Sequence, residues 1–162
     1  MTNKFPGLAR GPIDHNASSV INVIANEAIT MGSAVALVTS VPTDELLPRV
    51  DETDATTDVT YGIAVGGDTD GIYGDGTAAS DDSTRAAASA GQGIVVVTQG
   101  RCLARVNGLA TNIAVGDPLA ASTVAGVLVA SVATSQTIAR ALQTSNAADD
   151  IIAVDVQREG IF

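Results

Sequence analysis

The sequence has very few of the side chains on which most catalytic and metal sites depend. Its 162 residues include one cysteine, one histidine and no tryptophan. Cys102 has no partner in the chain, so an intrachain disulfide is excluded and stability must come from packing or association. Because Cys102 lies in an alternating apolar segment, we expect a small buried hydrophobic residue rather than a reactive thiol. His15 has no second histidine for a metal pair or a catalytic dyad, so we expect an ordinary loop residue.

Aromatic residues make up only 2% of the chain, although 46% of its residues are hydrophobic. The core must therefore be built from Val, Ile, Leu and Ala, and the length suits one domain. No stretch reaches the 18 or so consecutive apolar residues of a membrane span, and residues 1–16 lack the apolar run of a signal peptide. We expect a soluble protein that is made in a cytoplasm and has no membrane partner.

Negative charge is concentrated in one part of the chain. The net charge is −10, and residues 44–82 contain eleven Asp or Glu against the single Arg49, whereas the remainder carries seven acids and seven bases. Nucleic-acid contacts require clusters of basic residues, so this balance argues against nucleic acid as a partner. Asp is much commoner than Glu and Lys occurs once, a bias that suits a salty environment.

No catalytic motif accompanies these acids. The sequence has no Walker loop, no GxGxxG and no GxSxG elbow. The carboxylates occur as adjacent pairs at 44–45, 51–52 and 81–82, which does not resemble the opposed pair of a glycoside hydrolase. We therefore expect no enzyme activity and no cofactor.

The segment 68–76 has the alternating Asp and Gly residues that can surround a calcium ion. It departs from the EF-hand pattern because Ile72 and Ala79 occupy two ligand positions. We expect Asp68, Asp70 and Asp75 to lie in a solvated acidic loop without a metal, and an irregular calcium site is the alternative.

Short apolar runs separated by Gly, Asn, Asp, Thr and Ser predict strands joined by turns. The expected strands are 19–25, 33–39, 60–66, 93–98, 101–106, 126–132, 137–143 and 150–156. Only 83–90 has a helical composition, and it is too short to be stable alone. The sequence predicts an all-β fold, either a small β-barrel or a β-sandwich.

The chain also contains an internal repeat. Residues 29–36 match 113–120, which aligns a turn at Gly32 with one at Gly116. Two further matches pair 64–65 with 141–142, and 94–97 with 151–154. We expect a duplicated β unit whose first copy carries acidic loop insertions, the longer at about 67–92. Chance similarity between short apolar runs is the alternative.

The expected organisation is an extended N-terminal arm, residues 1–18, followed by a single β domain, residues 19–162. Two of the four aromatic residues, Phe5 and Phe162, lie at the ends of the chain. We expect Phe5, Leu8, Arg10 and Phe162 to bind a partner surface. The alternative is that the termini fold back onto their own domain.

Segments 112–120, 126–129, 138–142 and 151–156 carry a family resemblance. They contain a Gly116-Asp-Pro-Leu119 turn, an Ile138-to-Leu142 strand and a closing alternating strand. This pattern resembles the small head decoration, or capsid cement, proteins of tailed viruses. The resemblance covers residues 90–158 and, through the repeat, 20–66, whereas 1–18 and 67–92 depart from it.

The resemblance implies a structural virion protein on the outer surface of the capsid. Such a protein is made in the host cytoplasm, is commonly a homotrimer, and stabilises the capsid by bridging major capsid protein subunits. The Asp-rich, Lys-poor composition suits a virus of a halophilic host. The alternative function is a surface module that binds a carbohydrate or a receptor through the acidic loop.

Overall fold

The protein consists almost entirely of β-strands. The computed structural model describes residues 19–39, 47–67, 86–132 and 135–157, and within these ranges it contains strands and no helix. The strands are β1 (Ser19–Ala25), β2 (Ile29–Thr30), β3 (Ala34–Leu37), β4 (Arg49–Glu52), β5 (Thr60–Gly67), β6 (Ala86–Ala88), β7 (Gly93–Val106), β8 (Pro118–Ala121), β9 (Leu128–Ala130), β10 (Ala139–Ala141) and β11 (Asp150–Val156). The predicted all-β class is confirmed. The described residues include no helix long and apolar enough to cross a membrane.

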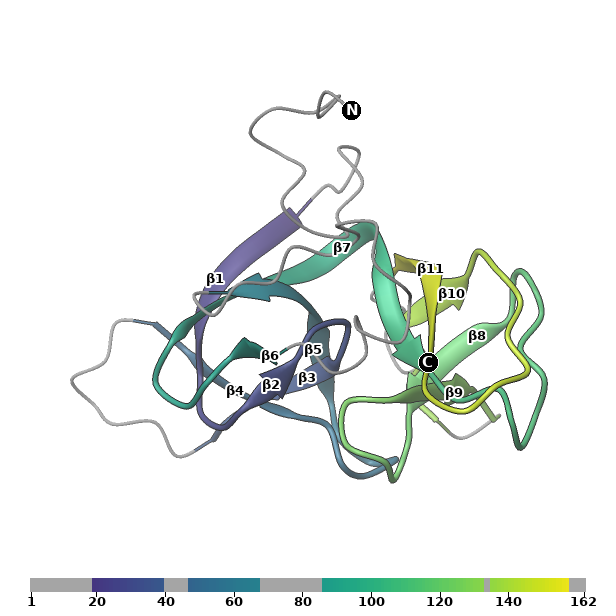
Figure 1. Cartoon of the computed structure of the whole chain (residues 1–162), viewed down its shortest axis with the longest axis horizontal. Helices are drawn as coiled ribbons and strands as arrows, with labels where there is room; N and C mark the ends of the chain where they lie inside the picture. The colour runs from purple at the N-terminus through teal and green to yellow at the C-terminus, as the bar shows by residue number, and fades with distance from the viewer. Residues whose placement is uncertain (1–18, 40–46, 68–85, 133–134, 158–162) are drawn as a thin grey trace.

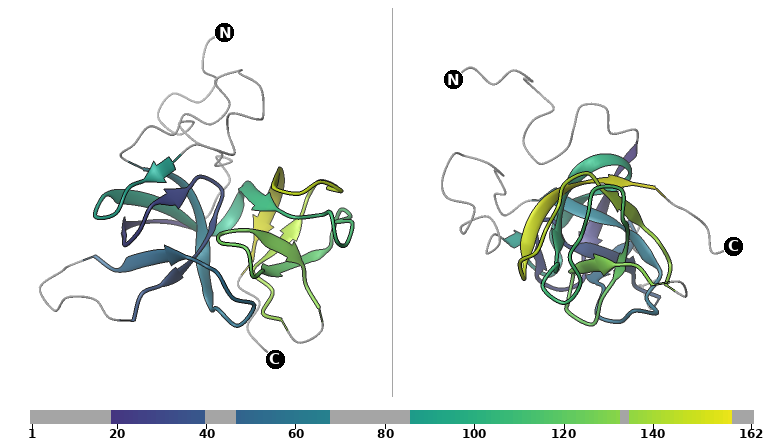
Figure 2. Two further views of the ribbon diagram at one scale, coloured as in Figure 1. Left: turned by 60° about the horizontal axis from the view of Figure 1, so that its bottom comes forward. Right: turned by 90° about the vertical axis from the view of Figure 1, so that its right-hand side faces the viewer.

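The strands form two closed rings that share the long strand β7 (Figure 1; Figure 2). The N-terminal ring runs β1-β4-β3-β5-β7 and is closed by pairing of β1 with β7. The C-terminal ring runs β7-β11-β10-β8-β9 and is closed by pairing of β7 with β9. Every strand of a ring therefore has two neighbours, as in a small β-barrel, although the contacts of β1 with β4 and of β7 with β9 involve only one or two residue pairs.

The two rings are copies of one unit, as the internal repeat predicted. Ala34 pairs with Ile63 in the N-terminal ring, and the corresponding Pro118 pairs with Arg140 in the C-terminal ring. The turns before β3 and β8 also match. Gly32 N–H donates to Ala64 O at 2.7 Å, and Gly116 N–H donates to Ala141 O at 2.8 Å. Both turn glycines have positive φ, 84° and 93°, which glycine adopts without strain.

One predicted match was wrong by a single residue. Ile94 pairs with Val23 on the first strand of its ring, and its counterpart Ile152 pairs with Ala104. Ile94 therefore corresponds to Ile152 rather than to Ile151. Successive residues of a strand face opposite sides, so a shift of one reverses the buried face. Ile94 and Ile152 are both buried, whereas Ile151 is only half-buried.

Three further expectations need correction. The segment 83–90 is not helical where it is described, because β6 pairs with β2 through Ala88 and Ile29. The acidic segment is not made only of solvent-facing loops, because Asp51 and Glu52 are half-buried in β4. Residues 68–85, which form most of the predicted insertion, lie outside the described residues. The strands expected at 93–98 and 101–106 are one continuous strand, β7.

Buried apolar side chains form two clusters, one in each ring. The first fills the N-terminal ring and includes Val23, Ile29, Met31, Val35, Val50, Ala64, Ile94 and Val96. The second fills the C-terminal ring and also includes four residues of the N-terminal ring, Ala34, Ile63, Val65 and Val97. Ile63 and Val65 thus pack toward one ring while Ala64 packs into the other. The interior of the C-terminal ring is completed by side chains from its neighbour.

Cys102 is one of the residues in the second cluster. It is 3% exposed, which confirms the expected buried hydrophobic role. Burial, with a smaller contribution from the charge of Asp155, raises the pKa of the thiol well above its ordinary value. The thiol therefore stays protonated at neutral pH.

Candidate functional site

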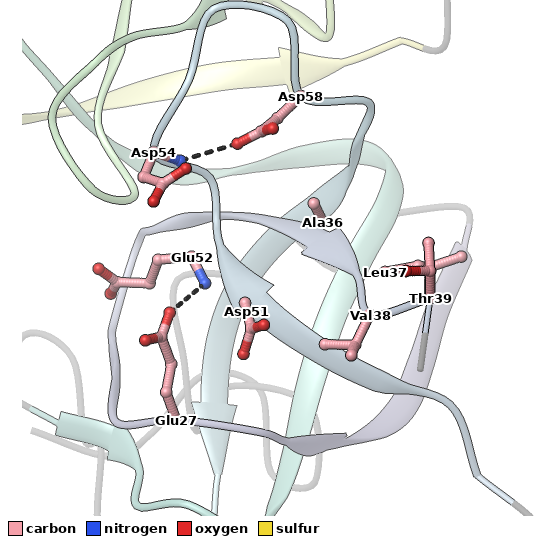
Figure 3. Close-up of a pocket in the computed structure, with 9 residues that line it drawn as sticks. All are labelled: Glu27, Ala36, Leu37, Val38, Thr39, Asp51, Glu52, Asp54 and Asp58. Atoms are coloured by element: carbon pink, nitrogen blue, oxygen red, sulfur yellow. Dashed lines mark hydrogen bonds between the residues drawn. The ribbon is translucent and has the colours of Figure 1, made fainter. Parts of the chain in front are cut away.

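An acidic groove of about 330 Å³ lies on the outer face of β3 and β4 (Figure 3). Five carboxylates and four other residues line it: Glu27, Ala36, Leu37, Val38, Thr39, Asp51, Glu52, Asp54 and Asp58. Alternation along β4 accounts for the position of Asp51, because Val50 points into the ring core and Asp51 points to the opposite face. Ala36, the cross-strand neighbour of Asp51, is small and leaves space above the sheet.

Backbone N–H groups hold several of these carboxylates in place. Glu27 Oε1 accepts a hydrogen bond from Glu52 N–H at 2.9 Å. Asp58 Oδ2 accepts from Asp54 N–H at 2.9 Å and Ala55 N–H at 3.0 Å, which fixes the loop between β4 and β5. Asp51 Oδ2 accepts from the Asn26 side chain at 3.2 Å, whereas its Oδ1 is buried without a hydrogen-bond partner.

The concentration of negative charge alters the titration of Glu27. Burial raises the pKa of Glu27 above its ordinary value, and the charges of Asp51, Glu52 and Asp54 raise it further. The hydrogen bond from Glu52 N–H acts in the opposite direction but does not cancel these effects. The folded protein therefore favours the protonated form of Glu27 more than the unfolded chain does.

This shift makes a pH-dependent prediction for Glu27→Gln. The cost of ionising Glu27 in the fold is absent below its unfolded pKa and fully present above its raised folded pKa. Glutamine keeps an acceptor oxygen for Glu52 N–H but carries no charge. We expect a higher melting temperature than wild type at pH 7, with the difference shrinking as the pH falls toward 4 and as NaCl is added. A difference that is independent of pH would contradict the charge explanation.

The C-terminal ring shows that the fold itself does not require these carboxylates. Ala36 pairs with Asp51 in the N-terminal ring, and Ala120 pairs with Val129 at the equivalent place. The position of Glu52 is likewise occupied by Ala130. Because one copy of the same face is acidic and the other is apolar, the groove is the best candidate for a functional surface in the described part of the chain.

The groove offers a ligand negative charge beside an apolar wall. Leu37 on this wall is 46% exposed. The described residues contain no group of three or more His, Cys, Asp or Glu side chains arranged to hold a metal ion. The carboxylates of the groove suit positively charged groups, which they would hold by charge.

The predicted partner-binding residues Phe5, Leu8, Arg10 and Phe162 lie outside the described residues. So do His15 and the candidate calcium segment 68–76. Sequence analysis did not find the groove, although it identified the acidic segment from which Asp51, Glu52, Asp54 and Asp58 come. Glu27 could not have been included, because only folding brings the loop after β1 beside β4.

Glu52 also connects the groove to the contact between the rings. Its Oε1 accepts hydrogen bonds from Thr30 N–H and Ser33 Oγ, both at 2.7 Å. Ser33 Oγ in turn accepts from Arg105 Nη1 at 3.3 Å, and Arg105 Nε bonds Asp149 at 2.8 Å. A chain of polar contacts thus runs from β4 of the N-terminal ring to β7 of the C-terminal ring.

Main-chain hydrogen bonds complete this contact, which we call the ring joint. In the N-terminal ring, Ile24 N–H donates directly to Pro48 O at 2.9 Å. The equivalent residues of the C-terminal ring, Arg105 and Gly126, do not bond each other directly, because residues 32–34 of the N-terminal ring lie between them. Arg105 N–H donates to Gly32 O at 2.9 Å, and Ala34 N–H donates to Gly126 O at 2.8 Å. Gly126 N–H donates to Thr53 O at 2.8 Å.

Comparison with known proteins shows a likeness at the level of structure. No protein-family model matches the sequence, and no curated protein sequence matches it either. The structure is similar to the head fiber gp8.5 N base of bacteriophage phi29, with a TM-score of 0.53 and 11% sequence identity. The similarity covers 89% of this chain and 98% of that one. At this identity it shows a shared fold: the two-ring arrangement is similar to that of a base in a phage head fiber.

Proposed function

We propose that the protein is a structural component of a tailed-phage virion, located on the outer surface of the capsid and bound to the major capsid protein. The observation that carries this proposal is the fold similarity to the phi29 head fiber base over 89% of the chain. The sequence resemblance of residues 90–158 to head decoration proteins supports the same class of function. The protein has no role as an enzyme in this proposal.

The proposed mechanism is mechanical. A subunit that binds across capsid protein joints adds buried area only in the assembled state, so it stabilises that state by mass action. In this proposal the subunit is a homo-oligomer, a trimer by the family resemblance, and the carboxylates of the acidic groove keep particles apart in a salty medium.

Cosedimentation tests the proposal. The purified chain is mixed with capsids assembled from the major capsid protein of the same genome, and bound protein is measured after centrifugation. We expect saturable binding by the full chain. Deletion of residues 1–12 should weaken binding at least about tenfold if Phe5, Leu8 and Arg10 are anchors, with no change in melting temperature.

The groove variant Asp54→Asn, Asp58→Asn is the matched control, and it should bind capsids like wild type. Absence of binding by the full chain would refute the capsid role. Equal binding by the deletion variant would refute the anchoring role of the arm alone.

A carbohydrate- or receptor-binding module is the second candidate, favoured by the exposed Leu37 beside the acidic groove. A glycan array probed with the full chain distinguishes the two functions. Glycan binding that is lost in the groove variant, together with no capsid binding, would establish this alternative.

A further inference from the structure

The strand shared by the two rings changes partners at a single residue. Residues 93–99 of β7 pair with β1 and β5 of the N-terminal ring, whereas residues 100–106 pair with β11 and β9 of the C-terminal ring. Gly100 lies at this boundary with φ of 107°. Figure 1 shows β7 turning from one ring into the other. Rotation about Gly100 would therefore break no hydrogen bond within either ring.

Among the described residues, such a rotation would break the contacts of the ring joint. They are the main-chain bonds of Gly32, Ala34 and Thr53 with Arg105 and Gly126, the Arg105–Ser33 bond, and the apolar contacts of Ala34, Ile63, Val65 and Val97 with the C-terminal cluster. Each contact joins one ring to the other. Two chains opened at Gly100 could remake every one of them with exchanged partners.

We propose that the C-terminal rings can be exchanged between two copies of this chain, with Gly100 as the hinge. The partner is thus a second copy, and the surface it uses is the ring joint already present in the monomer. Short connections under conformational strain favour such exchange, because an extended hinge relieves the strain while the interface is conserved. Gly100 itself is unstrained at φ of 107°, but a residue with a Cβ at this position would create such strain, since only glycine adopts this φ readily. The inference does not depend on the proposed capsid role.

Substitution of the hinge tests the proposal. Full-length wild type, Gly100→Ala and the control Gly91→Ala are refolded at low and high protein concentration, and masses are measured by light scattering after gel filtration. Gly91 has φ of 84° and open space around an added Cβ, so its substitution strains a turn outside the hinge. Alanine at position 100 disfavours the monomer, in which this residue has a positive φ. We therefore expect the dimer fraction of Gly100→Ala to be at least about fivefold higher than that of wild type.

Two outcomes support exchange and the others overturn it. The dimer must increase in Gly100→Ala but not in Gly91→Ala, and the isolated dimer must persist for hours after dilution, because separation requires opening of the joint. An equal increase in both variants, rapid dissociation on dilution, or no dimer in any variant would overturn the proposal. If Gly100→Ala does not fold, Gly100→Asn against Gly91→Asn provides the same comparison, because Asn tolerates positive φ better.

Discussion

Gly126→Ala should be among the most destabilising single-methyl additions in the molecule. Gly126 has φ of 69°, and an added Cβ would lie 2.4 Å from Ser33 Oγ and 2.5 Å from Ser33 Cβ. Ser33 is fully buried and its hydroxyl is held by Glu52, so it cannot move aside easily. Backbone strain of about 1 kcal/mol and overpacking of about 1–3 kcal/mol together predict a loss of about 2–4 kcal/mol in unfolding free energy.

Gly116→Ala is the matched control for this experiment. Gly116 has a similar positive φ, 93°, but nothing lies within 4 Å of an added Cβ. Its loss should be limited to the backbone strain of about 1 kcal/mol. Urea denaturation of the two variants measures the difference. Equal losses would mean that the ring joint is loose enough to accept the extra methyl group.

Exchanging two residues that occupy the same place in the two rings should cost very different amounts of stability. Ile63 and Arg140 are equivalent, because they pair with the equivalent residues Ala34 and Pro118. Ile63 is completely buried in the cluster at the ring joint. Ile63→Arg would place an unpaired charge there, so we expect a loss of at least about 3 kcal/mol, or failure to fold.

Arg140→Ile provides the reciprocal change on the C-terminal ring. Arg140 is half-buried and donates to Gly116 O at 3.3 Å. Its replacement should cost less than about 1 kcal/mol, because it removes a weak contact near solvent. Far-ultraviolet circular dichroism in urea measures both variants. Similar losses would show that the joint is hydrated and that Ile63 is not buried in solution.

Strands with one buried and one exposed face could be predicted from the sequence. Strands that are buried on both faces were predicted less reliably. The alternation in 150–156 identified β11 correctly, because one face is buried and the other is not. The run 94–97 has no alternation, since Val96 packs into one ring and Val97 into the joint. A run buried on both faces cannot specify its register, which explains the error of one residue in the repeat.

Two other elements were decided by tertiary contacts that composition does not reveal. The Ala-rich segment around Ala88 has helical propensity, yet it forms β6 because Ile29 offers a pairing partner. β4 was not predicted, because Arg49, Asp51 and Glu52 give it the composition of a loop. It lies between β1 and β3 in the N-terminal ring. The acidic groove was unpredictable for the same reason, because Glu27 and Asp58 line one groove only when this strand lies between them. The turn glycines, Gly32 and Gly116, could be predicted because their conformational role depends on local sequence.

The strand registers also place the start of β1 and the end of β11 at adjacent residues of β7. Ser19, where β1 begins, pairs with Gln99, and Val156, where β11 ends, pairs with Gly100. Ser19 and Val156 thus pair with neighbouring residues of β7, at the boundary between the two rings. A protein held by the segments that flank Ser19 and Val156 would be attached at the boundary between its two rings. Tension on the segment before Ser19 would load the N-terminal ring and tension on the segment after Val156 the C-terminal ring, so both forces would reach the boundary at Gly100.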